Sequence, residues 1–327
     1  MKAVSAGPAD REKLEDGIFL NNVSKWYGQV MGLIDVTAFI GKGVTGLLGP
    51  NGAGKSTLIK LVTGQIRPNK GNITAFGMPV WNNSRYYRMV GYCPEFENMY
   101  EWLTGFDFVN YLVRLHGYGK KDGEKLAWQA IDTVGMTKEA GRKIATYSKG
   151  MRQRIKLAQA IAHKPKILFL DEPLAGTDPI GRVEIINLIR QLGDEKSGIS
   201  VLVSSHILHE IERMTKRVLM VHKGRLLAWG DMNEIRDKLD RFPHSLSISS
   251  AEDRRLAKYL INMPEVSSVM VDEKESVLRV KILKPDNFYS KLPKILAKEK
   301  ISIDQLGSLD EDLESIFAYL TGGGGGK

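Results

Sequence analysis

Short apolar runs of the strand type alternate with amphipathic runs of the helix type along most of this chain. Clusters of β-branched and aromatic residues between turn signals predict strands, and apolar residues that recur every three to four positions predict helices. Residues 17–81 favour strands at 18–23, 30–40, 44–48 and 72–76, with one helix from about Thr57. Residues 96–163 are mostly helical in pattern, at 106–115, 124–134 and 150–162.

From residue 167 the strand and helix patterns alternate again. Strands are predicted at 167–170, 200–204 and 218–222, and helices at 183–192 and 207–214. Alternation of this kind indicates the α/β class, in which a largely parallel sheet carries helices on both faces. The helical block of residues 96–163 is then an insertion into the sheet domain.

The pattern changes near residues 240–243. Strands are predicted at 245–249, 266–271, 276–282 and 301–306, and helices at 251–261, 287–298 and 311–320. The order β-α-β-β-α-β is that of a ferredoxin-like α+β domain. We therefore expect a flexible arm at 1–16, a main domain at 17–240, an accessory domain at 241–321 and a flexible glycine-rich tail at 322–327.

The composition is typical of a soluble globular protein. The chain has 327 residues, of which 43% are hydrophobic and 26% charged, enough for one large and one small domain. The sequence contains neither a run of about 20 apolar residues nor an N-terminal secretory signal. Its single cysteine, Cys93, excludes an internal disulfide and a cysteine-cluster metal site. These features predict a cytoplasmic protein.

The positive charge is unevenly distributed. Residues 241–327 hold 13 basic and 13 acidic side chains, so the net charge of +9 falls entirely on the rest of the chain. Such an excess suits a nucleotide, an anionic membrane surface or nucleic acid, and it also occurs on an ordinary solvated surface. Basic residues do not interleave with aromatic ones in any run of five or more, so we expect no nucleic-acid partner.

The strongest chemical signal is a glycine-rich run between a predicted strand and a predicted helix. It reads Gly49-Pro50-Asn51-Gly52-Ala53-Gly54-Lys55-Ser56-Thr57. Backbone amides of such a loop, the helix N-terminus and the lysine charge together bind phosphate. We predict that Asn51, Gly52, Ala53, Gly54, Lys55, Ser56 and Thr57 bind a nucleotide, and that the Ser56 hydroxyl binds Mg²⁺.

A second signal is a buried strand that ends in two carboxylates. The run Ile167-Leu168-Phe169-Leu170 precedes Asp171 and Glu172. A carboxylate at the end of such a strand lies where Mg²⁺ sits beside a bound phosphate. The next residue is suited to orient or deprotonate an attacking water. Asp171 is therefore predicted as a metal ligand and Glu172 as the catalytic base.

With these motifs in order, the chain resembles the ATP-binding subunits of ABC transporters. The segment Tyr147-Ser148-Lys149-Gly150-Met151-Arg152-Gln153-Arg154 resembles the L-S-G-G-Q signature of that family, although it differs at 147, 149 and 151. Ser148 and Gly150, the two residues suited to bind a γ-phosphate, are retained. The resemblance implies a P-loop NTPase fold with a mixed sheet and a helical subdomain.

The resemblance also implies roles for residues outside these motifs. Tyr27 resembles the aromatic residue that stacks on adenine, and Asp178 lies in the equivalent of the D-loop. His206 resembles the switch histidine that contacts the γ-phosphate and completes the catalytic set of Glu172 and Lys55. In the family's Q-loop, Glu95 stands where most members have glutamine, so the resemblance makes it a third acidic candidate for the Mg²⁺ site.

The resemblance further implies the assembly. Two subunits arranged head to tail each lend Ser148 and Gly150 to the partner's ATP, and hydrolysis releases them. The chain is expected to be an ATPase that drives a separate integral-membrane permease, attached through it to the inner face of the membrane. Features of residues 204–208, 222–226 and 312–322 resemble subunits of exporters. Aromatic residues at positions 96–111 are expected to form the helical core and to expose about two rings to the permease.

Two other interpretations remain open on the sequence. A soluble ABC-type ATPase acting on ribosomes or DNA commonly carries two P-loops or a long coiled coil, whereas this chain has one P-loop and no heptad run. A nucleotide-gated regulatory subunit with weak hydrolysis is compatible with Glu95 and the altered signature. The transported substrate and the identity of the permease do not follow from these residues.

Overall fold

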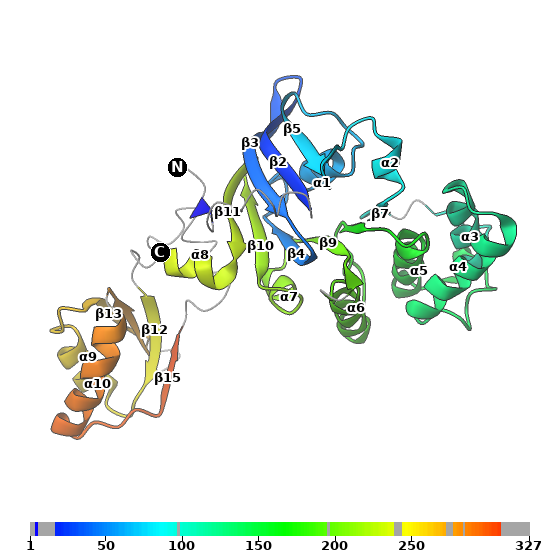
Figure 1. The fold of residues 1–327 in the computed structure, drawn as a ribbon. Helices are drawn as coiled ribbons and strands as arrows, with labels where there is room; N and C mark the ends of the chain where they lie inside the picture. Colours follow the sequence, from blue (N-terminus) through cyan, green and yellow to red (C-terminus); the bar gives the residue numbers. More distant parts are fainter. Residues whose placement is uncertain are drawn as a thin grey trace. The chain divides into compact units, whose positions relative to one another are not determined.

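The computed structural model describes residues 4–5, 17–96, 99–194, 197–238, 244–272, 277–283 and 285–308 (Figure 1). The chain divides into two compact units, Met1–Asp231 and Met232–Lys327. The division falls before residue 240, where the sequence pattern placed it, because α8 (Met232–Lys238) groups with the second unit. Among the described residues, no helix has both the length and the apolar character that crossing a membrane requires.

A seven-stranded mixed sheet forms the centre of the first unit. Its strand order is β1-β11-β10-β4-β9-β8-β7. The strands are β1 (Val4–Ser5), β4 (Gly43–Leu48), β7 (Val90–Cys93), β8 (Ile167–Leu170), β9 (Ser200–Ser205), β10 (Arg217–His222) and β11 (Arg225–Asp231). Strands β10, β4, β9, β8 and β7 are parallel, and β11 is antiparallel to β10. Every residue of β4, β8 and β9 is buried, as expected for strands covered on both faces.

Helices follow or precede the parallel strands. α6 (Pro179–Leu192) connects β8 to β9 and α7 (Leu208–Glu212) connects β9 to β10, whereas α1 (Lys55–Val62) follows β4 and α2 (Ser84–Tyr87) precedes β7. A second, antiparallel sheet has the order β3-β2-β5-β6 and belongs to the same unit. Its strands are β2 (Ile18–Tyr27), β3 (Val30–Ile40), β5 (Lys70–Ala75) and β6 (Met78–Pro79). Buried side chains of both sheets and of α1 form one apolar core, which fixes the start of α1 against the sheets.

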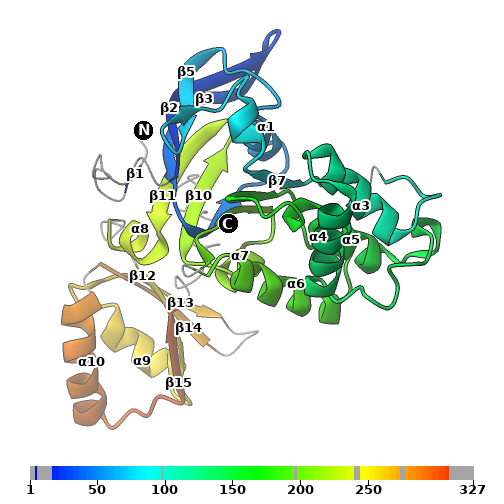
Figure 2. The same cartoon turned by 45° about the vertical axis from the view of Figure 1, so that its right-hand side comes forward.

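The helical block contains α3 (Gly105–Leu115), α4 (Lys120–Thr133) and α5 (Lys149–Ile161). Figures 1 and 2 both place these helices together beside the edge of the large sheet that ends in β7. Ser148 caps α5, because its Oγ accepts a hydrogen bond from the Met151 backbone N–H at 3.2 Å.

The second unit contains a four-stranded antiparallel sheet in the order β13-β14-β12-β15. Its elements after α8 are β12 (His244–Ser249), α9 (Asp253–Leu260), β13 (Val266–Asp272), β14 (Val277–Ile282), α10 (Pro285–Glu299) and β15 (Gln305–Ser308). This order and these pairings are those of a ferredoxin-like fold. Apolar residues of the strands and of both helices form a separate core.

The structure confirms the predicted fold class, an α/β P-loop domain with a small α+β unit, but corrects several elements. Val4–Ser5, expected in a flexible arm, pairs with β11, whose free edge offers unpaired backbone groups. β11 itself was not predicted. The last strand begins at Gln305 rather than at residue 301, because Ile301 packs into the core ahead of the strand. The helix predicted at 311–320 and the tail at 322–327 lie outside the described residues.

Candidate nucleotide site

A cavity of about 480 Å³ opens at the carboxyl ends of four parallel strands. The loop after β4 supplies residues 50–57 to it, and the ends of β7, β8 and β9 supply Glu95, the Asp171–Glu172 pair and His206. The β2–β3 hairpin contributes the wall formed by Tyr27, Val30, Met31 and Gly32. Parallel strands bring their carboxyl ends to one edge, so side chains that are distant in the sequence meet there.

The phosphate-binding loop is braced from both sides. Gly54, the residue before α1, has a φ of 110°. A Cβ at this position would lie 2.7 Å from the Gly32 carbonyl oxygen, so the loop requires glycine here. The Gly224 backbone N–H donates to the Ala53 carbonyl at 2.9 Å, and Gly224 in turn accepts from the Ile34 N–H at 2.7 Å. The turn between β10 and β11 and the strand β3 thus fix the loop.

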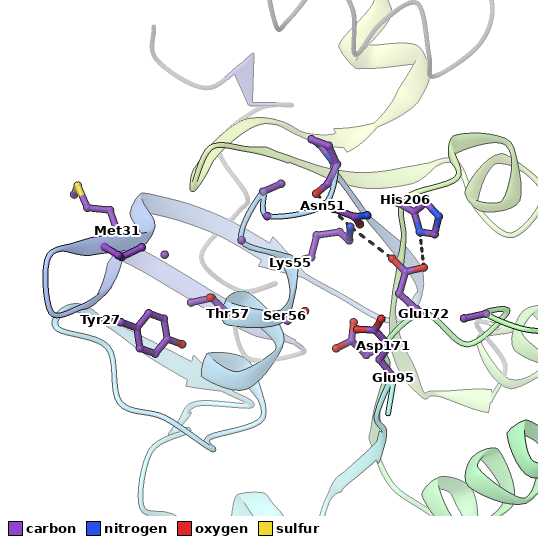
Figure 3. Close-up of a pocket in the computed structure, with 17 residues that line it drawn as sticks. Tyr27, Met31, Asn51, Lys55, Ser56, Thr57, Glu95, Asp171, Glu172 and His206 are labelled. Atoms are coloured by element: carbon purple, nitrogen blue, oxygen red, sulfur yellow. Dashed lines mark hydrogen bonds and ion pairs between the residues drawn. The ribbon is translucent and has the colours of Figure 1, made fainter. Parts of the chain in front are cut away.

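Glu172 lies between two basic side chains, next to the loop after β4. Figure 3 shows its carboxylate pointing to Lys55 on one side and His206 on the other. The Lys55 Nζ is 3.5 Å from Glu172 Oε1, and the His206 Nδ1 is 3.0 Å from Glu172 Oε2. Lys55 also donates to the Gly49 carbonyl at 2.7 Å. The Glu172 carboxylate is therefore oriented next to the loop that is predicted to bind phosphate.

The backbone of Glu172 has a left-handed conformation, with a φ of 48°. For a residue other than glycine this conformation costs about 1–3 kcal/mol and is found mainly at functional sites. It is held by Ser204, whose Oγ accepts from the Glu172 N–H at 2.9 Å and donates to Asp171 Oδ1 at 2.7 Å. Ser204 thus holds the Asp171 carboxylate and the Glu172 backbone, a function that the sequence reasoning missed.

Burial raises the pKa of both carboxyl groups. For Asp171, desolvation is the largest cause and the nearby Glu95 carboxylate adds to it, whereas the hydrogen bond from Ser204 and the charge of Lys55 act in the opposite direction. For Glu172, desolvation again raises the pKa, and His206 and Lys55 lower it. Asp171 and Glu95 are thus close enough to repel each other, and a bound cation relieves this repulsion.

The raised pKa of Asp171 predicts a pH-dependent stability. In the folded chain the carboxyl binds a proton more readily than in the unfolded chain. The stabilising contribution of Asp171 to the free energy of unfolding is therefore fully present below the pKa that the group has in the unfolded chain. It is lost as pH rises through the higher pKa of the folded chain. Asp171→Asn keeps an acceptor for Ser204 but carries no charge. We expect its free energy of unfolding, relative to the wild type, to increase between pH 4 and pH 7.

Urea unfolding of the nucleotide-free proteins, without Mg²⁺, checks this expectation. Parallel stability curves for the wild type and Asp171→Asn across that range would contradict it. A free energy of unfolding of the wild type that increases relative to that of the variant as pH rises would contradict it as well.

The other wall of the cavity is apolar. Tyr27 is 46% exposed and lies with Met31 at the end of the cavity away from His206 (Figure 3). Gly32 lets the Tyr27 ring and Thr57 approach, since a Cβ there would lie 3.1 Å from each side chain. Exposed Val30 and Met31, which the sequence reasoning did not select, were detectable as apolar residues in a tight hairpin.

Three of the predicted residues lie elsewhere. The cavity lining does not include Ser148, Gly150 or Asp178. Ser148 and Gly150 lie at the start of α5, and Asp178 is the residue before α6. In this chain the predicted nucleotide residues are therefore separated: most lie around the loop after β4, whereas Ser148 and Gly150 lie at the start of α5 and Asp178 at the start of α6.

Several known proteins are similar to this chain. A family model described as ABC transporter matches residues 36–175. The bacitracin transport ATP-binding protein BcrA of Enterococcus faecalis is 31% identical over 314 residues, 95% of this chain and 98% of BcrA. The daunorubicin/doxorubicin resistance ATP-binding protein DrrA of Streptomyces peucetius is 30% identical over 280 residues, 85% of this chain and 84% of DrrA.

Two further matches each cover 68% of this chain. An ABC transporter ATP-binding protein of Synechocystis sp. is 35% identical over 226 residues, which are 68% of this chain and 62% of that protein. The solved structure of an ATP-binding subunit of an ABC transporter superposes with a TM-score of 0.62 at 28% identity, covering 68% of this chain and 93% of that one.

Proposed function

Since this chain belongs to the family of ABC transporter ATP-binding proteins, we propose that it is the ATPase subunit of an exporter whose permease is a separate chain. The arrangement of Glu172 between Lys55 and His206 at the phosphate-binding loop carries this proposal. Steady-state release of phosphate from ATP by the purified chain tests it. A rate no higher than that of a Glu172→Gln variant would contradict it.

Each residue of the site has a role in this proposal. The backbone amides of residues 51–57 and the Lys55 ammonium hold the β- and γ-phosphates, and the apolar wall around Tyr27 receives the adenine. Glu172 accepts a proton from the attacking water, and His206 orients Glu172 and contacts the γ-phosphate. The hydrogen bond that the Glu172 N–H donates to the Ser204 Oγ keeps the Glu172 backbone in place throughout.

The donor set of the site suits Mg²⁺. The Ser56 hydroxyl and the Asp171 and Glu95 carboxylates offer oxygen ligands, which a hard cation prefers. Burial raises the pKa of Asp171 and the nearby Glu95 charge adds to this effect, and a bound cation would favour the charged form of the carboxylate. Ser56 and Asp171 would hold the ion, Glu95 would add a second carboxylate, and the ion would neutralise the phosphates during transfer.

Glu95 makes a specific prediction about metal dependence. Two charges about 4 Å apart at an effective dielectric constant of about 20 interact by about 4 kcal/mol before screening. The Glu95 carboxylate therefore attracts Mg²⁺ and repels a metal-free triphosphate. We expect Glu95→Gln to reduce the ratio of ATP affinity with Mg²⁺ to that without it about tenfold. Titration of ATP in Mg²⁺ and in EDTA measures the ratio, and an unchanged ratio would remove Glu95 from the metal site.

The first turn of α5 supports a site completed by a second copy. Gly150 lies inside a helix, where glycine costs about 1 kcal/mol relative to alanine. Nothing in this chain requires it, since a Cβ at Gly150 would meet only the Ser148 Oγ, at 4.0 Å. An open glycine beside a helix N-terminus suits the close approach of a phosphate from outside the chain. We therefore assign Ser148, Gly150 and Asp178 to the ATP held by a second copy.

Membership of the family supports a partner in the membrane. The names of BcrA and DrrA record bacitracin transport and daunorubicin/doxorubicin resistance, which support outward transport for this chain as well. The chain would then lie at the inner face of the membrane, bound to the permease. Among the aromatic residues at positions 96–111, four have exposed rings, rather than the expected two, and these rings offer a contact surface for it. They belong to Phe96, Tyr100, Trp102 and Tyr111.

A further inference from the structure

Side chains on one face of α5 contact residues 92–95, at the end of β7 and just after it. Three polar side chains on this face, spaced three residues apart, reach successive parts of that segment. Gln159 Nε2 donates to the Tyr92 carbonyl at 2.7 Å, Gln153 Nε2 lies 3.8 Å from the Cys93 Sγ, and Lys156 Nζ donates to the Glu95 carbonyl at 3.0 Å. The helix that begins at Ser148 is thereby tied to the residues that lead to Glu95.

Lys156 is unusual among these contacts because it is a buried cation. Its exposure is 3%, and lysine is almost never this buried without a partner. Its hydrogen bond to the Glu95 carbonyl is charge-assisted and therefore among the stronger kinds. Burial raises the pKa of the Cys93 thiol to about 11, and the charge of Lys156 lowers this pKa whereas that of Asp171 raises it.

Glu95 depends on its backbone for its position. Within the described part of the chain, no hydrogen bond or ion pair of the Glu95 carboxylate is found, and the side chain is exposed. Its distance to Asp171 is set by where residues 93–95 run. The Asp171 backbone N–H donates to the Cys93 carbonyl at 2.9 Å, which fixes the start of this segment, and Lys156 fixes its end.

We propose that Lys156 is a positioning residue that holds Glu95 at the Mg²⁺ site. The proposal rests on the proposed function, in which Glu95 contributes to metal binding. Without the ammonium group, the Glu95 carbonyl loses its charged donor and the segment after β7 is free to move away from Asp171. The carboxylate then no longer acts on the metal, although the residue itself is intact.

The test is the ratio of ATP affinity with Mg²⁺ to that in EDTA, measured by equilibrium titration on full-length variants. Lys156→Met has a side chain of similar length without the charge. We expect it to reduce this ratio about tenfold, as Glu95→Gln does. In the double variant Lys156→Met/Glu95→Gln we expect no further reduction, because both changes remove the same contribution.

Gln159→Leu is the matched control. It removes the neighbouring bond between α5 and the β7 segment but leaves the Glu95 carbonyl bonded, so the ratio should equal that of the wild type. A wild-type or increased ratio in Lys156→Met would overturn the proposal, as would reductions that multiply in the double variant or an equal loss in Gln159→Leu. If instead Glu95→Gln itself had no effect, the metal role of Glu95 would fail and this proposal with it, whereas the ATPase function would stand.

Discussion

Glu172→Gln is expected to lower steady-state ATP hydrolysis by about a hundredfold or more, since a positioned general base contributes about 10²–10⁴-fold. The amide keeps the size of the side chain but cannot accept the proton of the attacking water. The backbone N–H of residue 172 donates a hydrogen bond to the Ser204 Oγ. This bond does not involve the carboxylate and therefore remains in the variant. Phosphate release measures the rate, and ATP titration should show that affinity is retained.

A control for loss of one negative charge is Glu184→Gln. Glu184 lies on α6, is about half exposed and pairs with Arg154, outside the cavity. We expect hydrolysis by this variant to match that of the wild type. Equal turnover in Glu172→Gln and Glu184→Gln would show that Glu172 is not the base. Hydrolysis would then depend on another group.

The second large effect concerns Ser148, which has two separable roles. Its Oγ caps α5, and aspartate and asparagine are both good substitutes for serine at such a cap. Ser148→Asp therefore keeps the helix but places a negative charge against the phosphates of a second copy's ATP. A like charge in an interface costs several kcal/mol, so ATP-driven pairing should weaken by about a hundredfold or more. Ser148→Asn is neutral and should pair far better.

The sequence predicted the parts of the site that are local. The loop after β4 and the Asp171–Glu172 pair are continuous motifs, so their chemistry could be assigned without any knowledge of the fold. β11 was missed, although Lys223 and Gly224, both with positive φ, form the tight turn of a hairpin. That turn also braces the phosphate-binding loop through Gly224. In the sequence, this turn was recognised only as a segment that resembles exporter subunits. Its role in bracing the loop after β4 was not predicted.

Residues whose roles depend on packing could not be predicted. Ser204 reaches Asp171 and Glu172 because β9 pairs with β8 in a register that puts Val203 opposite Leu170. Apolar periodicity does not specify this register. Lys156 likewise looks like an ordinary helix residue until α5 is seen to pack against β7. Val4–Ser5 forms a strand only because β11, far away in the sequence, leaves an edge free.

The central claim is that one ATP is held between the phosphate-binding loop of one copy and the start of α5 of another. The most direct measurement is the mass of the Glu172→Gln protein by light scattering, with ATP and Mg²⁺ and with ADP. We predict twice the 36.5 kDa monomer mass with ATP and the monomer mass with ADP, and in the Ser148→Asp background the monomer mass in both. A monomer under all conditions, or an ATP-dependent dimer unaffected by Ser148→Asp, would contradict the account.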